Sequence, residues 1–120
     1  MANRVAGVAY LKVSGQQYPL RGNLQVSPSR VERTGIAGQD GVHGYSELPR
    51  VPFIVGDVTL DPALSMEALE ATVDATVTAE LANGKVYVLS NAWCKAALEL
   101  NTAEGMVNVR FEGLDCDELS

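Results

Sequence analysis

Strict alternation of apolar and polar residues in the second half of the chain most constrains the fold. The segment DATVTAEL has apolar residues at every second position from 75 to 81, separated by Thr76, Thr78 and Glu80. Successive side chains of an extended strand point to opposite faces, so this pattern predicts a half-buried strand. The segments KVYVLSN, KAALELN and MVNVRFEG alternate similarly, and the turn sequence TAEG precedes the last of them. They predict an antiparallel meander, with a two-residue hairpin turn at Asn83 and Gly84.

The first half of the chain also favours extended structure. GVAYLKVSG alternates, with Leu11 and Val13 on one side and Tyr10 on the other, and SGQQ then predicts a turn. YPLRGNLQVS is a second predicted strand, whose Pro19 restricts its start to a sheet edge or a bulge. In VPFIVGDVTL, a further predicted strand, Gly56 indicates a bulge or a bend.

One short helix is predicted within LDPALSMEALEATVD. Asp61 and Pro62 are good helix-entry residues, and Ser65 is a second candidate cap. Met66, Leu69 and Val73 follow with helical spacing over roughly ten residues. The predicted fold class is therefore mainly β, with about seven strands in two packed antiparallel sheets, a sandwich or partly open barrel, flanked by this helix. Residues 1–120 show no internal repeat or linker, which predicts a single domain.

The segment GIAGQDGVHGYSELPRVP, residues 35–52, holds four of the eleven glycines and the only histidine, His43. A phosphate-binding loop would need a lysine and a following helix, and neither is present. Ser46 lies outside any Gly-x-Ser-x-Gly elbow, and nothing indicates a base beside a nucleophile. Asp40, His43 and Glu47 could supply three metal ligands, but an exposed polar loop is the favoured interpretation. The sequence therefore predicts no catalytic, cofactor-binding or metal-binding residue, and no enzyme.

This segment and its flank, residues 31–52, instead predict a long irregular loop. About twenty irregular residues are unusual in a compact domain, and such loops are usually functional or disordered. Apolar residues are scattered through the segment: Ile36, Val42, Tyr45, Leu48 and Val51. Exposed apolar residues need a surface to pack against, so a neighbouring subunit is the natural candidate.

Charge is distributed unevenly along the chain. Residues 1–50 contain six basic and three acidic residues, a balance of +3, whereas residues 51–120 contain three basic and twelve acidic residues, a balance of −9. The sharper interpretation is a molecule with a basic side and an acidic side that can stack on copies of itself. The net charge of −6 argues against a nucleic-acid-binding surface. We expect the acidic C-terminal DCDELS to be a frayed, solvated tail.

Cys94 and Cys116 lack metal-ligand spacing, which predicts two reduced thiols. No apolar stretch approaches the roughly 20 residues that span a bilayer. The N-terminal residues do not match a signal peptide, so we expect synthesis in the cytosol.

Four segments in a fixed order closely resemble one family. They are RGNLQVSPSRVERTGIAGQDGVHGY, ELPRVPFI, VDATVTAELANGKVYVLSNAW and VRFEG. Together they resemble the tail tube protein of Mu-like contractile-tailed bacteriophages, the myovirus tail tube family, over nearly the whole chain. The resemblance implies a fold similar to that of type VI secretion tube proteins, in which six subunits form a ring and rings stack into a tube.

The resemblance also implies partners and a location. The expected partners are copies of the same chain in ring and stacked-ring contacts, and the tail sheath, tape-measure and baseplate proteins. DNA would pass through the lumen without specific binding, no cofactor or membrane segment is expected, and the protein would assemble in the host cytoplasm and reside in the virion tail.

Two sets of residues acquire expected roles in such a tube. The long loop at about 31–52 would contact neighbouring subunits, through Arg33, Ile36, Gln39, Asp40, Val42, His43, Tyr45, Leu48 and Arg50. An acidic lumen would keep DNA from adhering, and Glu80, Glu99 and Glu112 are candidates to line it because they lie on predicted polar strand faces. Which sheet faces the lumen stays open. Two alternative functions also remain, a subunit of a type VI-like or other contractile injection tube and a monomeric ligand-binding β-barrel.

Overall fold

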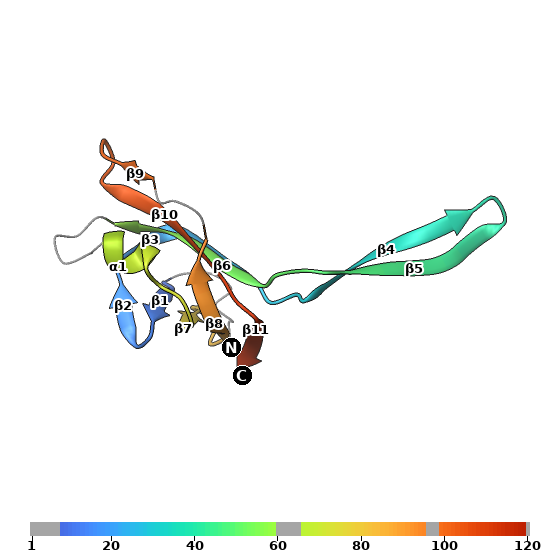
Figure 1. Ribbon diagram of the computed structural model, residues 1–120, viewed down its shortest axis with the longest axis horizontal. Helices are drawn as coiled ribbons and strands as arrows, with labels where there is room; N and C mark the ends of the chain where they lie inside the picture. Colours follow the sequence, from blue (N-terminus) through green and yellow to red (C-terminus); the bar gives the residue numbers. More distant parts are fainter. Residues whose placement is uncertain (1–7, 60–65, 96–98, 120) are drawn as a thin grey trace, which may run out of the picture.

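The computed structural model describes residues 8–59, 66–95 and 99–119. A β-structured body holds most of these residues, and a long two-stranded hairpin projects from one end of it (Figure 1). The principal-axis extents of the molecule are 61 × 42 × 28 Å, and the long dimension includes the hairpin.

The body consists of two antiparallel layers. In spatial order, the first layer contains β2 (Gln16–Tyr18), β1 (Tyr10–Val13), β7 (Ala75–Glu80), β8 (Val86–Cys94) and β11 (Asp115–Leu119). The second contains β3 (Leu20–Ser27), β6 (Phe53–Thr59), β10 (Met106–Glu112) and β9 (Leu100–Asn101). This arrangement confirms the predicted fold class of a mainly β protein with two antiparallel sheets.

The end of β8 joins the two layers into one nine-stranded sheet. Trp93 and Cys94 pair with Glu112 and Phe111 of β10, whereas the earlier residues of β8 pair with β7 and β11. Asn91 has a φ of 51°, and the pairing of β7 with β8 shifts register beside it. An extra residue of this kind bends a strand, which lets β8 pass from one layer to the other.

Alternating side chains from both layers form the core. Val77 and Ala79 of β7 and Val107 and Val109 of β10 are at most 1% exposed. The remaining core residues are Leu11, Val13, Ile54, Val58, Leu69, Leu89, Ala92, Phe111 and Cys116. The period-2 pattern therefore predicted the inward faces of β1, β7 and β10 correctly.

Two predicted turns have different outcomes. Ser14 and Gly15 both have positive φ and form the tight connection between β1 and β2, as SGQQ predicted. The predicted two-residue turn at Asn83 and Gly84 is wrong. The Gly84 N–H donates to the Leu81 carbonyl at 3.1 Å and the Leu81 N–H donates to the Lys85 carbonyl at 2.9 Å, so three residues form the loop and Gly84 has a φ of 92°.

The bulge predicted at Gly56 lies in the neighbouring strand instead. Pairing of β6 with β10 is continuous through Gly56, whereas β3 shifts register between Gly22 and Gln25, opposite this glycine. A Cβ atom at Gly56 would lie 2.9 Å from Leu20 Cδ1 and 3.4 Å from Leu24 Cδ1. Glycine is therefore needed here because two leucines of the bulged β3 pack against its Cα.

The helix is shorter than predicted. α1 (Met66–Glu70) contains five residues, and the predicted entry residues 61–65 lie outside the described residues. Leu69 is buried as predicted, but Val73 lies beyond the helix with 72% of its surface exposed. Assigning Val73 to the packed helical face was wrong because the chain leaves the helix at Thr72, whose carbonyl accepts a hydrogen bond from the Cys94 N–H.

Two more predicted segments differ. The C-terminal acidic segment is strand β11 and not a frayed tail, because it pairs with β8 from Asp115 to Leu119. Of the strand predicted in KAALELN, only β9 is a strand among the described residues, and residues 96–98 lie outside them. No helix in the described part of the chain is long and apolar enough to cross a membrane.

Candidate functional site

The projecting hairpin occupies the segment that was predicted to be an irregular loop. β4 (Val31–Gly38) pairs with β5 (Gly41–Pro49), and Gln39 and Asp40 form the turn at the tip. The prediction of irregular structure was wrong because glycines and a bulge at His43 interrupt the apolar alternation on which it relied. Gly41 and Gly44 have φ values of 135° and 143°, conformations that favour glycine.

The base of the hairpin is tied to the body. The Arg50 N–H donates to the Arg30 carbonyl at 2.8 Å and continues the ladder toward the body. Arg30 Nη1 lies 2.5 Å from Asp115 Oδ1 at the start of β11, and the Gly113 N–H donates to the Pro52 carbonyl at 3.2 Å. These contacts direct the hairpin away from both layers (Figure 1).

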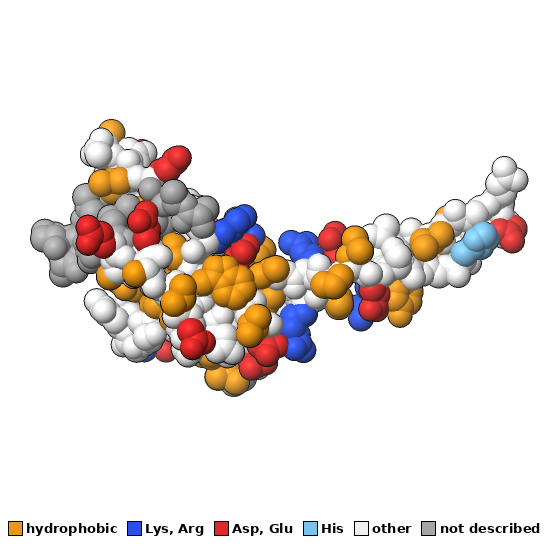
Figure 2. All heavy atoms as spheres, in the orientation of Figure 1, with side chains coloured by type: hydrophobic (Ala, Val, Ile, Leu, Met, Phe, Trp, Pro, Cys, Tyr) orange, Lys and Arg blue, Asp and Glu red, His pale blue; other side chains and the backbone are white. Residues whose placement is uncertain are grey.

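Beyond its base the hairpin projects away from the described strands of the body (Figure 1). Every residue from 28 to 51 is exposed. Large apolar side chains are among them, and Val42, Tyr45 and Leu48 expose 83%, 62% and 62% of their surfaces. Figure 2 shows apolar side chains along the length of the hairpin on the visible face. So much apolar surface on a projecting element is typical of an interaction site.

Polar contacts within the hairpin fix several side chains. Arg33 Nε lies 2.8 Å from Glu47 Oε1, and the Arg33 guanidinium carbon lies 5.8 Å from the centre of the Tyr45 ring. His43 Nε2 lies 2.6 Å from Asp40 Oδ1 at the tip. A Cβ atom at Gly38 would lie 2.3 Å from His43 Cε1, so the imidazole ring covers this glycine.

The structure thus places all nine predicted loop residues on the hairpin or directly at its base. Arg33 and Ile36 lie on β4, Gln39 and Asp40 at the tip, and Val42, His43, Tyr45 and Leu48 on β5, with Arg50 just after it. Sequence reasoning missed Val31, which pairs with Pro49 and is 40% exposed. The available signal was the pair of turn residues, Gln39 and Asp40, between two glycines, which is typical of the centre of a hairpin.

The three acidic residues predicted to line a lumen do not share a face. Glu80 lies on the outer face of the first layer, where its Oε1 is 3.1 Å from Lys12 Nζ. Glu112 lies on the outer face of the second layer, with its Oε2 3.4 Å from Arg110 Nε. Glu99 is exposed just before β9. Because the outer faces of a sandwich point away from each other, one face can present Glu80 or Glu112 but not both.

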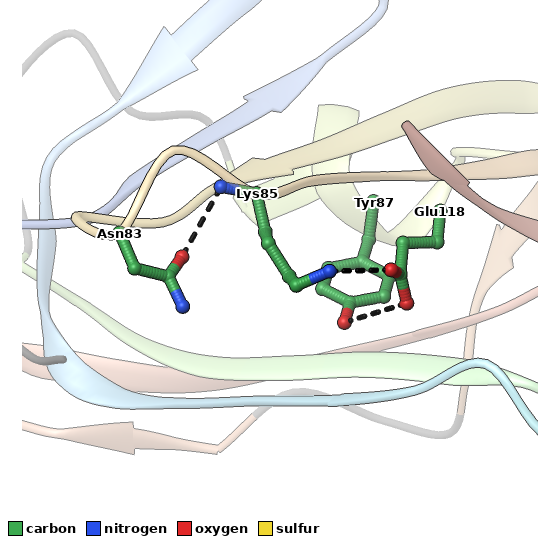
Figure 3. A network of polar contacts seen from close by, with 4 residues as sticks. All are labelled: Asn83, Lys85, Tyr87 and Glu118. Atoms are coloured by element: carbon green, nitrogen blue, oxygen red, sulfur yellow. Dashed lines mark hydrogen bonds and ion pairs between the residues drawn. The ribbon is translucent and has the colours of Figure 1, made fainter. Parts of the chain in front are cut away.

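A polar network holds the end of β11 against the turn between β7 and β8 (Figure 3). Lys85 Nζ and the Tyr87 hydroxyl donate to the two carboxylate oxygens of Glu118, at 2.6 and 3.1 Å. These hydrogen bonds lower the pKa of Glu118, and that carboxylate raises the pKa of Lys85. The Asn83 side chain accepts from the Lys85 N–H at 3.1 Å. These side-chain contacts add to the backbone pairing of β11 with β8 at this acidic end.

The groups that could support catalysis are dispersed or unreactive. No three metal-ligating side chains cluster in residues 8–59, 66–95 and 99–119. Burial raises the pKa of both the Cys94 and Cys116 thiols, which disfavours the nucleophilic thiolate. The His43 contact to Asp40 is exposed at the tip of the hairpin. The hairpin is therefore the candidate functional element, and its chemistry is that of an interface.

Comparisons with known proteins point to one family. Residues 2–118 match the family model described as phage tail tube protein. The Mu-like prophage FluMu tail tube protein of Haemophilus influenzae is 27% identical over 116 residues, which are 97% of this chain and 97% of that protein.

Solved structures of contractile injection systems share the fold. The anti-feeding prophage tube-terminating cap superposes with a TM-score of 0.68 at 10% identity, covering 100% of this chain and 94% of that one. The PVC sheath/tube terminator in its extended state has a TM-score of 0.63 at 9% identity, covering 93% of each chain. The PVC sheath–tube complex in its extended state has a TM-score of 0.59 at 11% identity, covering 93% of this chain and 88% of that one.

Proposed function

The chain belongs to the phage tail tube protein family, and from this premise we propose that it polymerises as stacked hexameric rings. In this proposal the stacked rings form the inner conduit of a contractile tail, surrounded by the sheath, and DNA leaves through their lumen. The family assigns a structural role in the virion tail. The ring, the conduit and the contacts with the sheath, tape-measure and baseplate proteins belong to the proposal, as do assembly in the host cytoplasm and a role for residues 1–120 as one tail tube domain.

The observation that carries the proposal is the exposed hairpin. Its apolar side chains find no partner within the described part of the chain, and a second copy would supply one. A contact between the hairpin of one copy and a different surface of the next copy is heterologous. Repetition of such a contact generates a closed ring or an open filament. We propose that residues 31–52 form this assembly element.

Charges of both signs lie at each end of the subunit, so the predicted basic side and acidic side are not separated along its length. At the base of the hairpin, Arg30 pairs with Asp115. α1 and the turn between β9 and β10 lie at the opposite end of the body and carry Glu67 and Glu104 (Figure 1). Arg21 lies there too, because its Nη1 donates to the Glu104 carbonyl at 2.7 Å.

Unpaired edges support closure of the ring. Within the described residues, β2, β3 and β11 each have a neighbouring strand on one side only. Edge strands expose backbone donors and acceptors that another chain can pair with. Pairing between copies would continue the sheets around a lumen.

We further propose that the first layer faces that lumen. Its outer face carries Glu80 and Asp117, which share alternating rows with Tyr10 and Lys12 across β1, β7, β8 and β11. Lys12 pairs with Glu80 on this face, so Asp117 supplies its excess negative charge, whereas the outer face of the second layer places Arg110 and Lys95 beside Glu112. An acidic lining repels DNA and lets it pass without adhering.

Two alternatives are kept. A tube subunit of another contractile injection system would share this fold, and the superposed injection-system structures favour that possibility on fold alone. A monomeric ligand-binding β-barrel would hold its ligand in an internal cavity and would not associate with other copies.

Sedimentation and negative-stain electron microscopy of the purified protein test the proposal. We expect rings or tubes at high concentration. A shortened variant in which Asn-Gly replaces residues 34–46 should fold and remain monomeric, because Arg33 and Glu47 already face each other across the hairpin. Only monomers of the full chain at high concentration would overturn assembly, and tube growth by the shortened variant would overturn the role of the hairpin.

A further inference from the structure

The two faces of the hairpin can be assigned from its register. Val31, Arg33, Gly35 and Ala37 of β4 pair with Pro49, Glu47, Tyr45 and Val42 of β5, and these residues form what we call the tyrosine face. Glu32, Thr34, Ile36 and Gly38 pair with Leu48, Ser46, Gly44 and Gly41, and these form the leucine face. The bulge at His43 moves Val42 onto the tyrosine face, since Ala37 pairs with Val42 and Ile36 with Gly44.

Large apolar side chains are exposed on both faces. Val42 and Tyr45 lie on the tyrosine face, and Ile36 and Leu48 lie on the leucine face, where they expose 47% and 62% of their surfaces. A hairpin that docks flat on one surface normally has one apolar face and one polar face. Here each face combines exposed large apolar side chains with polar ones, so neither is the purely polar face of such a hairpin.

We propose that the assembled hairpin is buried on both faces, inserted into the seam between two neighbouring copies of this chain. This inference rests on the proposed function, since it specifies how the assembly element is bound. One flat surface of one copy can cover only one face of a two-stranded ribbon, so two surfaces are required. Two copies that meet side by side provide both.

The two faces are suited to contacts of different kinds. The tyrosine face carries Tyr45 with Arg33 beside its ring and Glu47 paired to Arg33. Tyrosine and arginine are enriched at the energetic centres of interfaces. The leucine face combines Leu48 and Ile36 with small polar residues, Thr34 and Ser46, and with Glu32 at the end nearest the body. We expect the first contact to be polar and directional and the second to be mainly hydrophobic.

The first test compares one substitution on each face with a matched control on the body. The variants are Tyr45→Ser, Leu48→Ser and, as the control, Val73→Ser, a residue that is 72% exposed outside the hairpin. Burial of a large apolar side chain at an interface stabilises the assembly. Its replacement by serine should therefore raise the critical concentration for assembly about tenfold or more. Both hairpin variants should show this shift, and each should remain folded by circular dichroism because its side chain is exposed in the subunit.

The second test measures burial directly and does not depend on how strongly a variant assembles. Val42→Cys and Leu48→Cys are treated with a maleimide before and after assembly, and the modified peptide is quantified by mass spectrometry. We expect both cysteines to react with the maleimide in the subunit. In the tube both should react at least about tenfold more slowly, because they are removed from solvent.

The outcomes separate this inference from the proposed function. If the unsubstituted chain never assembles, the proposed function fails and this inference fails with it. If the chain assembles but one face stays reactive and tolerates its serine substitution, the two-sided seam is wrong while the tube stands. Equal loss of assembly by Val73→Ser would show that any exposed apolar residue matters, which would also overturn the assignment.

Discussion

Asp57 shows how one residue of the outer face fixes a bend in the chain. It is 7% exposed on β6, and its two carboxylate oxygens accept from Asn23 Nδ2 at 2.6 Å and Asn108 Nδ2 at 2.9 Å. Asn23 has a φ of 55° within the bulge of β3. The carboxylate therefore holds the bulge that packs Leu20 and Leu24 against Gly56.

Replacing Asp57 should destabilise the subunit. Asp57→Ala removes the acceptor of two hydrogen bonds, each of which contributes about 0.5–1.5 kcal/mol, because the exposed Asn23 and Asn108 amides can donate to water instead. Asn108→Ala is the control, because Asn108 is exposed and contributes one of the two bonds, so its loss should be smaller. Urea unfolding below the concentration of assembly measures both free energies of unfolding, and equal values would contradict this account.

The same carboxylate predicts a dependence of stability on pH. The hydrogen bonds from Asn23 and then Asn108 lower the pKa of Asp57 below its ordinary value of 3.8, with a smaller contribution from the charge of Arg21, and burial opposes them. A lowered folded-state pKa gives stability that is present above pH 3.8 and is lost as the pH falls through the folded value. Asp57→Ala should therefore lose less stability than the unsubstituted chain on acidification below that pH. Parallel acid limbs in urea titrations would show that the carboxylate is not linked to folding.

At the scale of elements, the turns illustrate what local sequence could predict. The sequence identified Gly84 as a turn residue but not the loop length, because Asn-Gly fits both a two-residue turn and the three-residue loop that the structure has. The choice depends on how Leu81 and Lys85 pair, which is a contact between strands.

A substitution at Gly84 tests this loop. Gly84→Ala places a Cβ at a φ of 92°, and such strain should cost about 1 kcal/mol or more. Gly22→Ala is the matched control, since a Cβ atom at Gly22 would have no neighbour within 4 Å and the φ of this residue is not in the left-handed region. Thermal unfolding should show a lower midpoint for Gly84→Ala alone.

The sequence located the segment that forms the hairpin but predicted an irregular loop instead of two strands, and this error has a physical reason. Four positions of the hairpin are glycines, which carry no side chain, and the bulge at His43 shifts the alternation by one residue. The apolar residues of the hairpin therefore follow no regular spacing in the sequence. The body was predictable because burial in one shared core imposes period 2 on β1, β7 and β10. No such core acts on β4 and β5 in the described subunit, where the backbone ladder, the contacts at the base and side-chain contacts such as that of Arg33 with Glu47 order the strands.

At the scale of the molecule, the arrangement of the two layers limits which of the predicted acidic residues can share one lumen-facing surface. Glu80, Glu99 and Glu112 were equivalent in the sequence because each lay on a predicted polar face. Only the assembled sandwich shows that Glu80 and Glu112 point in opposite directions, since this depends on which strands neighbour β7 and β10. A lumen therefore has to be bounded by one layer.

The layer that faces the lumen can be identified by comparing how a small and a large thiol reagent react with the outer face of each layer. Thr78→Cys places a thiol on the outer face of the first layer, between Lys12 and Val88, and Gln25→Cys places one on the outer face of the second layer. In assembled tubes a small maleimide should label both, because water and small solutes fill the lumen. A maleimide on a large dextran should label Gln25→Cys but not Thr78→Cys, except near tube ends, while both react in the unassembled subunit. The reverse pattern would place β3, β6 and β10 on the lumen and would assign the conduit surface to Glu112 instead of Glu80.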